Sequence, residues 1–193
     1  MLSKLLSHKI YDELLKANIK NRKDLDCFRR QIAKKYKLPL FKNSELLSIY
    51  HEFSAKKGFT PNYPLEKALI KRPVRSLSGI VNVSVLTKPY PCPGKCIFCP
   101  TQKNIPKSYL AGEPAVQRAM ANKFSPYKQV AMRLKALRLT GHPVDKVELR
   151  IIGGTWSYYP KKYQEWFIKE CFRSCNSCGS SASTSLLKPC FNS

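Results

Sequence analysis

Residues Ile80–Pro100 read IVNVSVLTKPYPCPGKCIFCP, and this stretch decides the fold. Its first part, Ile80–Thr87, is rich in β-branched residues, which predicts a buried strand. The strand leads directly into a loop with Cys92, Cys96 and Cys99 at a C-x3-C-x2-C spacing. The prolines around these cysteines block helix and strand, so an irregular loop is expected. A strand that carries its chemistry at its carboxyl end is typical of α/β barrels.

The spacing of the three cysteines predicts an iron–sulfur cluster. Three thiolates from one short loop hold three irons of a [4Fe-4S] cube and leave the fourth iron open. In radical enzymes S-adenosylmethionine chelates such an open iron, and Phe98 fits an aromatic side chain that shields the cluster or packs against adenine. Two other interpretations stay open. They are three unrelated thiols and a structural zinc site, which normally needs a fourth Cys or His nearby.

The composition indicates a polyanionic partner. The 193 residues include 35 Lys and Arg against 12 Asp and Glu, for a net charge of +23, which exceeds what solubility requires. No stretch approaches the roughly 18 to 20 apolar residues of a membrane span, and the start lacks a signal-peptide core, so no membrane partner is expected. The eight cysteines, without an export signal, favour a reducing cytoplasmic location.

Residues 1–75 are predicted to form a basic helical region. Apolar residues recur at helical spacing up to Leu15, a second helix should end before Pro39, and shorter helices are expected at Ser44–Phe53 and Leu65–Ile70. The cations around the second helix are Arg22, Lys23, Arg29, Arg30, Lys34, Lys35 and Lys37. Each one alone is typical of a solvated helix face. Together they favour RNA binding, because clustered cations gain affinity through counterion release.

Residues 76–174 are predicted to continue in the order strand, helices, strand, helix. After the cysteine loop, the expected elements are helices at Ala115–Lys123 and Ser125–Thr140, a strand at Val147–Ile152 and a helix at Lys161–Phe172. The second strand ends in Gly153-Gly154-Thr155. Paired glycines at a strand end are more often a tight turn than a ligand site. Beside a cluster strand, however, they predict a site for the methionyl group of S-adenosylmethionine.

From about Lys71 to Arg173 the chain resembles the radical S-adenosylmethionine domain of the elongator protein 3 family. Besides the cysteine loop, the stretches that carry the resemblance are Arg75–Ile80, Ser108–Tyr109, Gly112–Pro114, Arg118–Ala119, Pro126–Tyr127, Leu139–Glu148 and Gly153–Thr155. The resemblance implies an α/β fold, namely an incomplete radical-SAM (β/α) barrel preceded by a small basic helical domain.

The resemblance also implies a tRNA-modifying enzyme that forms a carboxymethyl-type group at C5 of the wobble uridine. Acetyl-CoA would be the carbon donor and a 5′-deoxyadenosyl radical the reactive species. Cys92, Cys96 and Cys99 would be the cluster ligands, and Lys146 matches a family lysine assigned to acetyl-CoA, although alone it is typical of a solvated charge. The implied partners are tRNA, acetyl-CoA and either Elongator-type subunits or a separate chain supplying missing domains. No catalytic side chain is identified.

Residues 175–193 are expected to form a low-complexity tail, disordered or frameshifted, because their small polar composition suits neither helix nor strand. Relative to the family, the chain is expected to lack the rest of the barrel and the acetyltransferase domain. Cys171, Cys175 and Cys178 repeat the C-x3-C-x2-C spacing, but no proline-shaped loop surrounds them, which favours coincidence or incidental metal binding over a second cluster. Two alternatives to the enzyme remain, a non-catalytic RNA-binding iron–sulfur or zinc protein and an inactive gene fragment.

Overall fold

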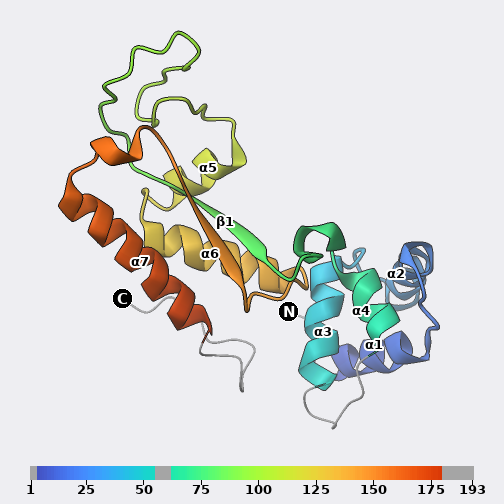
Figure 1. Cartoon of the computed structure of the whole chain (residues 1–193). Helices are drawn as coiled ribbons and strands as arrows, with labels where there is room; N and C mark the ends of the chain where they lie inside the picture. Colours follow the sequence, from blue (N-terminus) through green and yellow to red (C-terminus); the bar gives the residue numbers. More distant parts are fainter. Residues whose placement is uncertain (1–3, 55–61, 180–193) are drawn as a thin grey trace. The chain divides into compact units, whose positions relative to one another are not determined.

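The computed structural model describes residues 4–54 and 62–179. The chain divides into two compact units. Unit 1 contains residues 1–79 and 136–143, and unit 2 contains residues 80–135 and 144–193. Figure 1 labels the main helices and a strand along the chain. Unit 1 therefore receives a short segment from far along the sequence, which the expected boundary near residue 75 did not include.

Unit 1 is built from helices. They are α1 (Lys4–Lys16), α2 (Arg22–Tyr36), α3 (Asn43–Ser54), α4 (Tyr63–Leu69) and the 3-10 turn η1 (Pro73–Ser76). Their apolar faces meet in one core, and its fully buried side chains include Ile10, Leu14, Leu25, Leu46 and Leu65. The four helices lie where the apolar periodicity predicted them, whereas η1 was not expected.

The ends of α2 follow from local chemistry. The side chain of Asn21 accepts hydrogen bonds from the backbone amides of Lys23 and Asp24, and Asp24 reaches back to the Asn21 amide, which forms a capping box. At the other end Lys37 adopts a left-handed conformation with φ of 53°. The helix therefore ends at Tyr36, before the proline that limits it.

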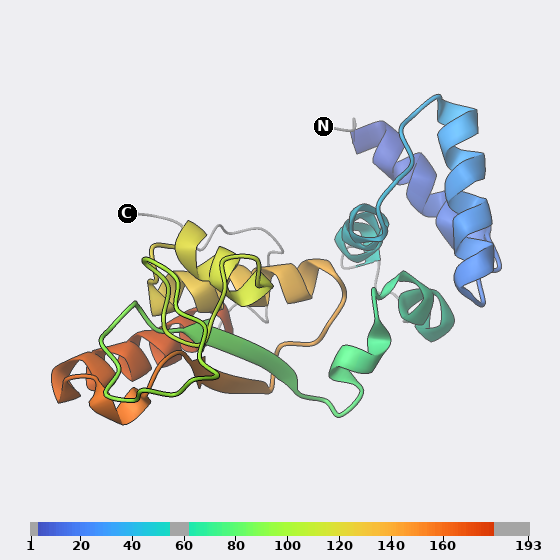
Figure 2. The ribbon, with the colours of Figure 1, turned by 90° about the horizontal axis from the view of Figure 1, so that it is seen from above.

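Unit 2 is an α/β arrangement around a small parallel sheet. Its elements are β1 (Val81–Leu86), α5 (Pro114–Ala121), α6 (Pro126–Leu139), β2 (Val147–Ile152), the 3-10 turn η2 (Trp156–Tyr158) and α7 (Lys161–Gly179). The strands pair in parallel from Val81 opposite Val147 to Leu86 opposite Ile152. Figure 2 shows α5 and the start of α6 together on one side of the strands. The α/β class is confirmed, and the incomplete barrel stays a prediction.

The core of unit 2 forms on β1. Val81, Val83, Val85 and Leu86 are all buried, whereas the residues of β2 are half-buried or exposed. Leu86 belongs to a small cluster with Ile105, Val116 and Ala119. The carboxyl end of β1, where the cysteine loop begins, is therefore anchored in a buried cluster of the unit.

The helix α7 is longer than the sequence predicted. It continues past Phe172 to Gly179, so the first residues of the expected tail are helical. Cys171 is buried, and burial raises the pKa of its thiol to about 12, which keeps it protonated and favours a packing role. The side chain of Cys178 and residues 180–193 lie outside the described residues. Neither α7 nor any other helix in the described ranges combines the length and apolar character of a membrane span.

Candidate functional site

The two predicted motifs follow the carboxyl ends of neighbouring strands. Thr87, directly after β1, donates its backbone amide to the carbonyl of Ile152 at the end of β2, with an N···O distance of 3.0 Å. The cysteine loop leaves β1 at this point, and the glycine turn leaves β2. Figure 1 shows the long irregular loop between β1 and α5 that carries the cysteines. The parallel register therefore delivers both motifs to the same edge of the sheet.

Two tyrosines hold the junction between β1 and the cysteine loop. The Tyr159 hydroxyl donates to the carbonyl of Lys88 at 2.8 Å and lies 2.9 Å from the Thr87 hydroxyl. The Tyr163 hydroxyl accepts from the backbone amide of Lys88 at 3.1 Å. The Tyr159 ring stacks on Tyr90 and Tyr163, with centroids 4.9 and 5.1 Å apart. Burial raises the pKa of both phenols, that of Tyr163 to about 12, so both stay protonated.

The sulfur of Cys92 lies beside the glycine turn. Its Sγ atom is 3.3 Å from the Thr155 hydroxyl oxygen. This hydroxyl, with a further contribution from the backbone of Gly94, holds the pKa of the Cys92 thiol below its ordinary value. The sulfurs of Cys92 and Cys96 both approach Gly94, since a Cβ added there would lie 3.6 and 3.5 Å from them. The structure thus brings two of the three cysteines and Thr155 to one place.

The third cysteine is held from later in the same loop. The Ser108 hydroxyl donates to the Sγ atom of Cys99 at 2.8 Å, and the Lys107 ammonium donates to the carbonyl of Gly94 at 2.8 Å. Ser108 lies in one of the stretches that carry the family resemblance, but no local pattern predicts its contact with Cys99 or the contact of Lys107 with Gly94. Their partners lie too far along the chain for helix or turn spacing to indicate the contact.

The spacing of the three cysteine thiols allows two kinds of metal group, a zinc ion and an iron–sulfur cluster. Cys92, Cys96 and Cys99 are free thiols, and in the described ranges no three His, Cys, Asp or Glu side chains are placed to hold one metal ion. A zinc site needs its ligands to converge on one atom at about 2.0–2.3 Å. In a cluster each thiolate binds a different iron, so the sulfurs stay apart. Three thiols on one loop match the donor set of such a cluster, and which metal group they bind stays a prediction.

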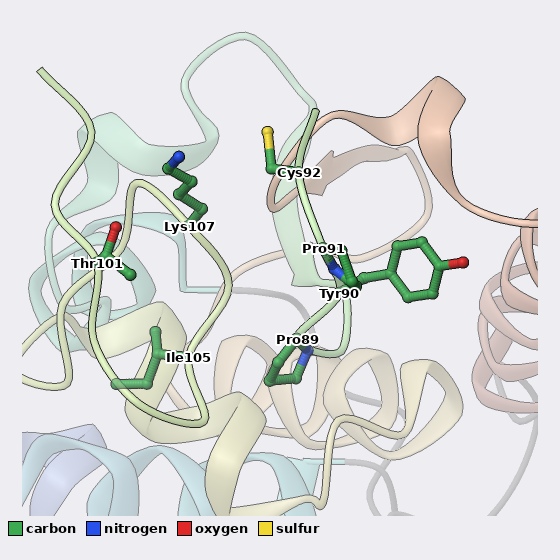
Figure 3. Close-up of a pocket in the computed structure, with 7 residues that line it drawn as sticks. All are labelled: Pro89, Tyr90, Pro91, Cys92, Thr101, Ile105 and Lys107. Carbon is green, nitrogen blue, oxygen red and sulfur yellow. The ribbon is translucent and has the colours of Figure 1, made fainter. Parts of the chain in front are cut away.

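A pocket of about 490 Å³ opens next to Cys92. Figure 3 shows it between the segment that contains Pro89 and Cys92 and the segment that contains Thr101 and Lys107, with the Tyr90 ring pointing away from it. Pro91 and Ile105 complete its lining. Small-molecule sites typically occupy about 300–1,000 Å³, so the pocket is large enough for a ligand beside the cysteines.

The two glycines of the turn differ in their surroundings. A Cβ atom on Gly153 would overlap the Thr87 hydroxyl oxygen, and the φ of +153° at Gly153 is one that residues with a Cβ rarely adopt, so both features require glycine there. A Cβ on Gly154 would meet nothing within 4 Å. The backbone is therefore open at Gly154 and covered at Gly153.

Two predicted site residues do not join this group. Phe98 is 90% exposed, so its predicted packing on a cofactor stays a prediction. Lys146 precedes β2, and its carbonyl accepts from the amide of Val81 at the opposite end of the sheet from the cysteine loop. Strands of six residues span roughly 20 Å. Any role of Lys146 toward acetyl-CoA therefore lies away from the cysteines.

A basic surface runs along α2. Lys23, Arg30 and Lys34 on the helix, with Lys37 just after it, are exposed and follow one another at helical spacing, which places them on one face. We call these four residues the α2 basic face. Two other cations near α2 are engaged within unit 1, because Lys35 pairs with Glu13 at 2.6 Å and Arg29 pairs with Asp26 at 2.9 Å.

The sequence of this chain is similar to those of several named proteins. No family model matches the chain. A tRNA uridine(34) acetyltransferase from Methanocaldococcus infernus is 36% identical over 183 residues, which are 91% of this chain and 33% of that protein. One from Dehalococcoides mccartyi is 50% identical over 107 residues, 55% of this chain and 23% of that protein. Elongator complex protein 3 of Drosophila melanogaster is 32% identical over 178 residues, 86% of this chain and 31% of that protein. The chain thus spans a third or less of the length of these relatives.

Proposed function

Because the chain belongs to the Elongator protein 3 family, we propose that it carries the cluster site of a radical S-adenosylmethionine enzyme that modifies C5 of the tRNA wobble uridine. The observation that carries the proposal is the contact between Cys92 and Thr155, which supports a shared site for the cysteine loop and the glycine turn. The names of the relatives support tRNA uridine as the substrate. Acetyl-CoA as the co-substrate is part of the proposal, since an acetyl transfer needs an acetyl donor.

In this proposal Cys92, Cys96 and Cys99 hold a [4Fe-4S] cluster. When bound and reduced, such a cluster would supply the electron that cleaves S-adenosylmethionine into methionine and a 5′-deoxyadenosyl radical. The protein's own part is to present three thiolates, to keep the Cys92 thiol readily ionised through Thr155, and to leave the backbone at Gly154 open to the methionyl group. The pocket beside Cys92 offers room for that ligand.

The α2 basic face is the proposed contact for the tRNA backbone. Its four cations lie along one side of a helix whose residues rise by about 1.5 Å each, so a stretch of phosphates can follow them. The excess of cations in the whole chain favours an anionic partner in the same way. Binding of this kind recognises phosphate charge, so selection of the wobble base belongs to the site in unit 2.

The cluster is tested by anaerobic reconstitution of the full chain with iron and sulfide. We expect the protein to take up a cubane cluster and, once reduced, to release 5′-deoxyadenosine from S-adenosylmethionine. Cys96→Ala should lose the cluster, while Cys27→Ala, which removes an exposed cysteine of α2, should keep it. Iron and sulfide analysis with electron paramagnetic resonance measures the loading, and chromatography measures the nucleoside.

Two results would overturn the enzyme proposal. The first is a protein that binds one zinc ion tightly and takes up no more iron and sulfide than Cys96→Ala. The second is a fully loaded protein that releases no 5′-deoxyadenosine. Either result, combined with retained RNA binding, would leave a non-catalytic RNA-binding metalloprotein as the function of this chain.

The RNA contact is tested by charge removal. Arg30→Gln with Lys34→Gln should weaken tRNA binding and reduce the slope of log affinity against log salt by about one for each phosphate that is no longer neutralised. The matched control, Lys162→Gln with Lys169→Gln, removes the same charge from exposed positions of α7. Equal losses of affinity in the two variants would contradict a specific role of the α2 basic face.

A further inference from the structure

A short segment after the cysteines folds back over their loop. Lys107 and Ser108 make three hydrogen bonds to it, and all three partners lie at least eight positions earlier. The Lys107 ammonium donates to the Gly94 carbonyl at 2.8 Å, and the Ser108 amide donates to the Pro100 carbonyl at 3.0 Å. The third bond runs from the Ser108 hydroxyl to the Cys99 sulfur at 2.8 Å. Lys107 therefore holds the cysteine loop near its start, at Gly94, and Ser108 holds it at its end, at Cys99 and Pro100.

The backbone of Ser108 is in an unfavourable conformation. Its φ of +79° lies in the left-handed region, which costs a residue with a Cβ roughly 1–2 kcal/mol and which glycine adopts freely. Glycine would therefore satisfy the backbone at this position better than serine does. What serine adds is the hydroxyl that meets the Cys99 sulfur, and strained residues of this kind cluster at functional sites.

The hydroxyl contacts are unequal among the three cysteines. Cys92 has Thr155 and Cys99 has Ser108, whereas no side-chain donor reaches the Cys96 sulfur within the part of the chain that the structure describes. Hydrogen bonds to the ligating sulfurs are one of the factors that set the potential of an iron–sulfur cluster. A donor stabilises the extra negative charge of the reduced state, and partners of ligands also fix their orientation.

We propose that Ser108 is a positioning residue of the metal-binding loop, which orients the Cys99 thiolate and makes the bound cluster easier to reduce. This inference rests on the proposed function, because it assumes that Cys99 is a cluster ligand. Thr155 has the corresponding contact with Cys92. The Lys107 bond to Gly94 holds the loop so that the Ser108 hydroxyl stays within reach of the sulfur.

The test uses Ser108→Gly, which removes the hydroxyl and relieves the backbone strain, so the variant should fold. Its control is Asn104→Gly, which relieves a left-handed residue of the same loop, with φ of +62°, and has no contact with a sulfur. In a redox titration followed by electron paramagnetic resonance, Ser108→Gly should contain several-fold less reduced cluster at a fixed potential. A tenfold change would equal 59 mV for this one-electron couple. Asn104→Gly should titrate like the wild type.

A second measurement needs no cluster. In the apo-protein at about pH 10, above the ordinary thiol pKa of about 8.5, iodoacetamide should alkylate Cys99 several-fold faster in Ser108→Gly than in the wild type. The rate at Cys96 should not change. A loaded Ser108→Gly protein with wild-type potential and wild-type alkylation would overturn the inference while the proposed function stands. A wild type that takes up no cluster would overturn the proposed function, and the alkylation ratio would still decide whether Ser108 holds the sulfur.

Discussion

The glycine turn at the end of β2 shows how one neighbouring atom can explain a residue. From the sequence, Gly153 and Gly154 are equivalent candidates for a ligand site. In the structure, Gly153 faces the hydroxyl of Thr87, which is buried and bonded to Tyr159, while Gly154 faces open space. The contact with Thr87 and the φ of +153° at Gly153 distinguish them, and neither is visible in the local sequence.

This difference predicts opposite outcomes for two alanine variants. Gly153→Ala should lower the free energy of unfolding by about 1–3 kcal/mol, because the new methyl group overlaps the Thr87 hydroxyl. Gly154→Ala, the matched control, should leave stability nearly unchanged. Denaturant unfolding measures both. Adding Thr87→Ala to Gly153→Ala should recover part of the loss, and a double variant no better than the sum of the single ones would contradict the steric explanation.

The contacts of Glu13 in α1 predict that the stability of unit 1 depends on pH. Hydrogen bonds from Lys35 and Tyr36 hold the pKa of the Glu13 carboxyl below its ordinary value of 4.5. Since the folded pKa lies below the unfolded one, the stabilisation is present above about pH 4.5 and is lost as pH falls through the folded pKa. The pair is largely exposed, so Glu13→Gln should cost at most about 1 kcal/mol at neutral pH.

Urea unfolding of Glu13→Gln and the wild type at pH 6 and pH 3 checks this expectation. The two proteins should differ at pH 6, and the difference should become smaller at pH 3 as the Glu13 carboxyl takes up a proton. Glu165→Gln on α7 makes the same charge change at an exposed position and serves as the control. A difference that persists unchanged at pH 3 would show that the carboxylate is not the source of the stabilisation.

At the scale of elements, the outer edge of β1 is closed by side chains. The buried amide of Gln129 in α6 accepts from the backbone amide of Leu86 at 3.0 Å and donates to the Leu86 carbonyl at 2.9 Å. The Arg118 guanidinium of α5 donates to the carbonyl of Ser84 at 3.0 Å. Side chains thus take the place of the backbone hydrogen bonds that a further strand would make. They protect the edge of β1 from pairing with a strand of another chain.

Gln129→Leu should therefore destabilise unit 2. It leaves the buried amide and carbonyl of Leu86 without these partners, and each unsatisfied group should lower the free energy of unfolding by about 1–3 kcal/mol. Hydrogen exchange should show the Leu86 amide losing protection. Gln117→Leu, an exposed position on α5, is the control and should change little. Unchanged exchange at Leu86 in Gln129→Leu would contradict the role assigned to this amide.

The tyrosine junction before the cysteine loop gives a second prediction at this scale. Tyr159→Phe keeps the stacked ring but removes the hydroxyl that bonds the Lys88 carbonyl and leaves the buried Thr87 hydroxyl without that partner. We expect a loss of about 1–3 kcal/mol in stability and faster proteolysis of the cysteine loop. Tyr158→Phe removes a hydroxyl from a ring that is 49% exposed and should have little effect. Similar losses of stability in both variants would mean that the hydroxyl bonds do not hold the junction.

The sequence predicted the elements well and their contacts poorly, for one physical reason. Apolar periodicity and capping residues are local, so α6 between Ser125 and Gly141 and the strand β2 were found close to their observed bounds. The end of α7 was missed because composition suggested a tail, whereas burial of Cys171 and Ser174 continues the helix. The contacts of Ser108 and Tyr159 were missed because their partners lie too far away in the sequence for a local pattern to indicate them.

At the scale of the whole chain, unit 1 depends on residues that the chain supplies late. Residues 136–143 belong to it, although unit 2 intervenes in the sequence. The buried ring of His142 lies 2.8 Å from the Ser76 hydroxyl through Nδ1 and 2.9 Å from the Lys71 carbonyl through Nε2. A carbonyl only accepts, so Nε2 carries the proton and Nδ1 accepts from Ser76. The fixed tautomer ties this late segment to the end of the helical region.

Gly141 gives this dependence a direct test. Its φ is +85°, and a Cβ there would lie 2.8 Å from Ile70 and 2.9 Å from Leu47, so Gly141→Ala combines backbone strain with crowding of the unit 1 core. We expect hydrogen exchange to accelerate in α3 and α4, more than 70 residues earlier in the chain, and not in β1. Gly112→Ala, which meets nothing within 4 Å, should change neither region. Acceleration confined to residues 136–146 would mean that the helical region holds together without the late segment, whereas spread into α3 and α4 would make the two stretches one cooperative unit.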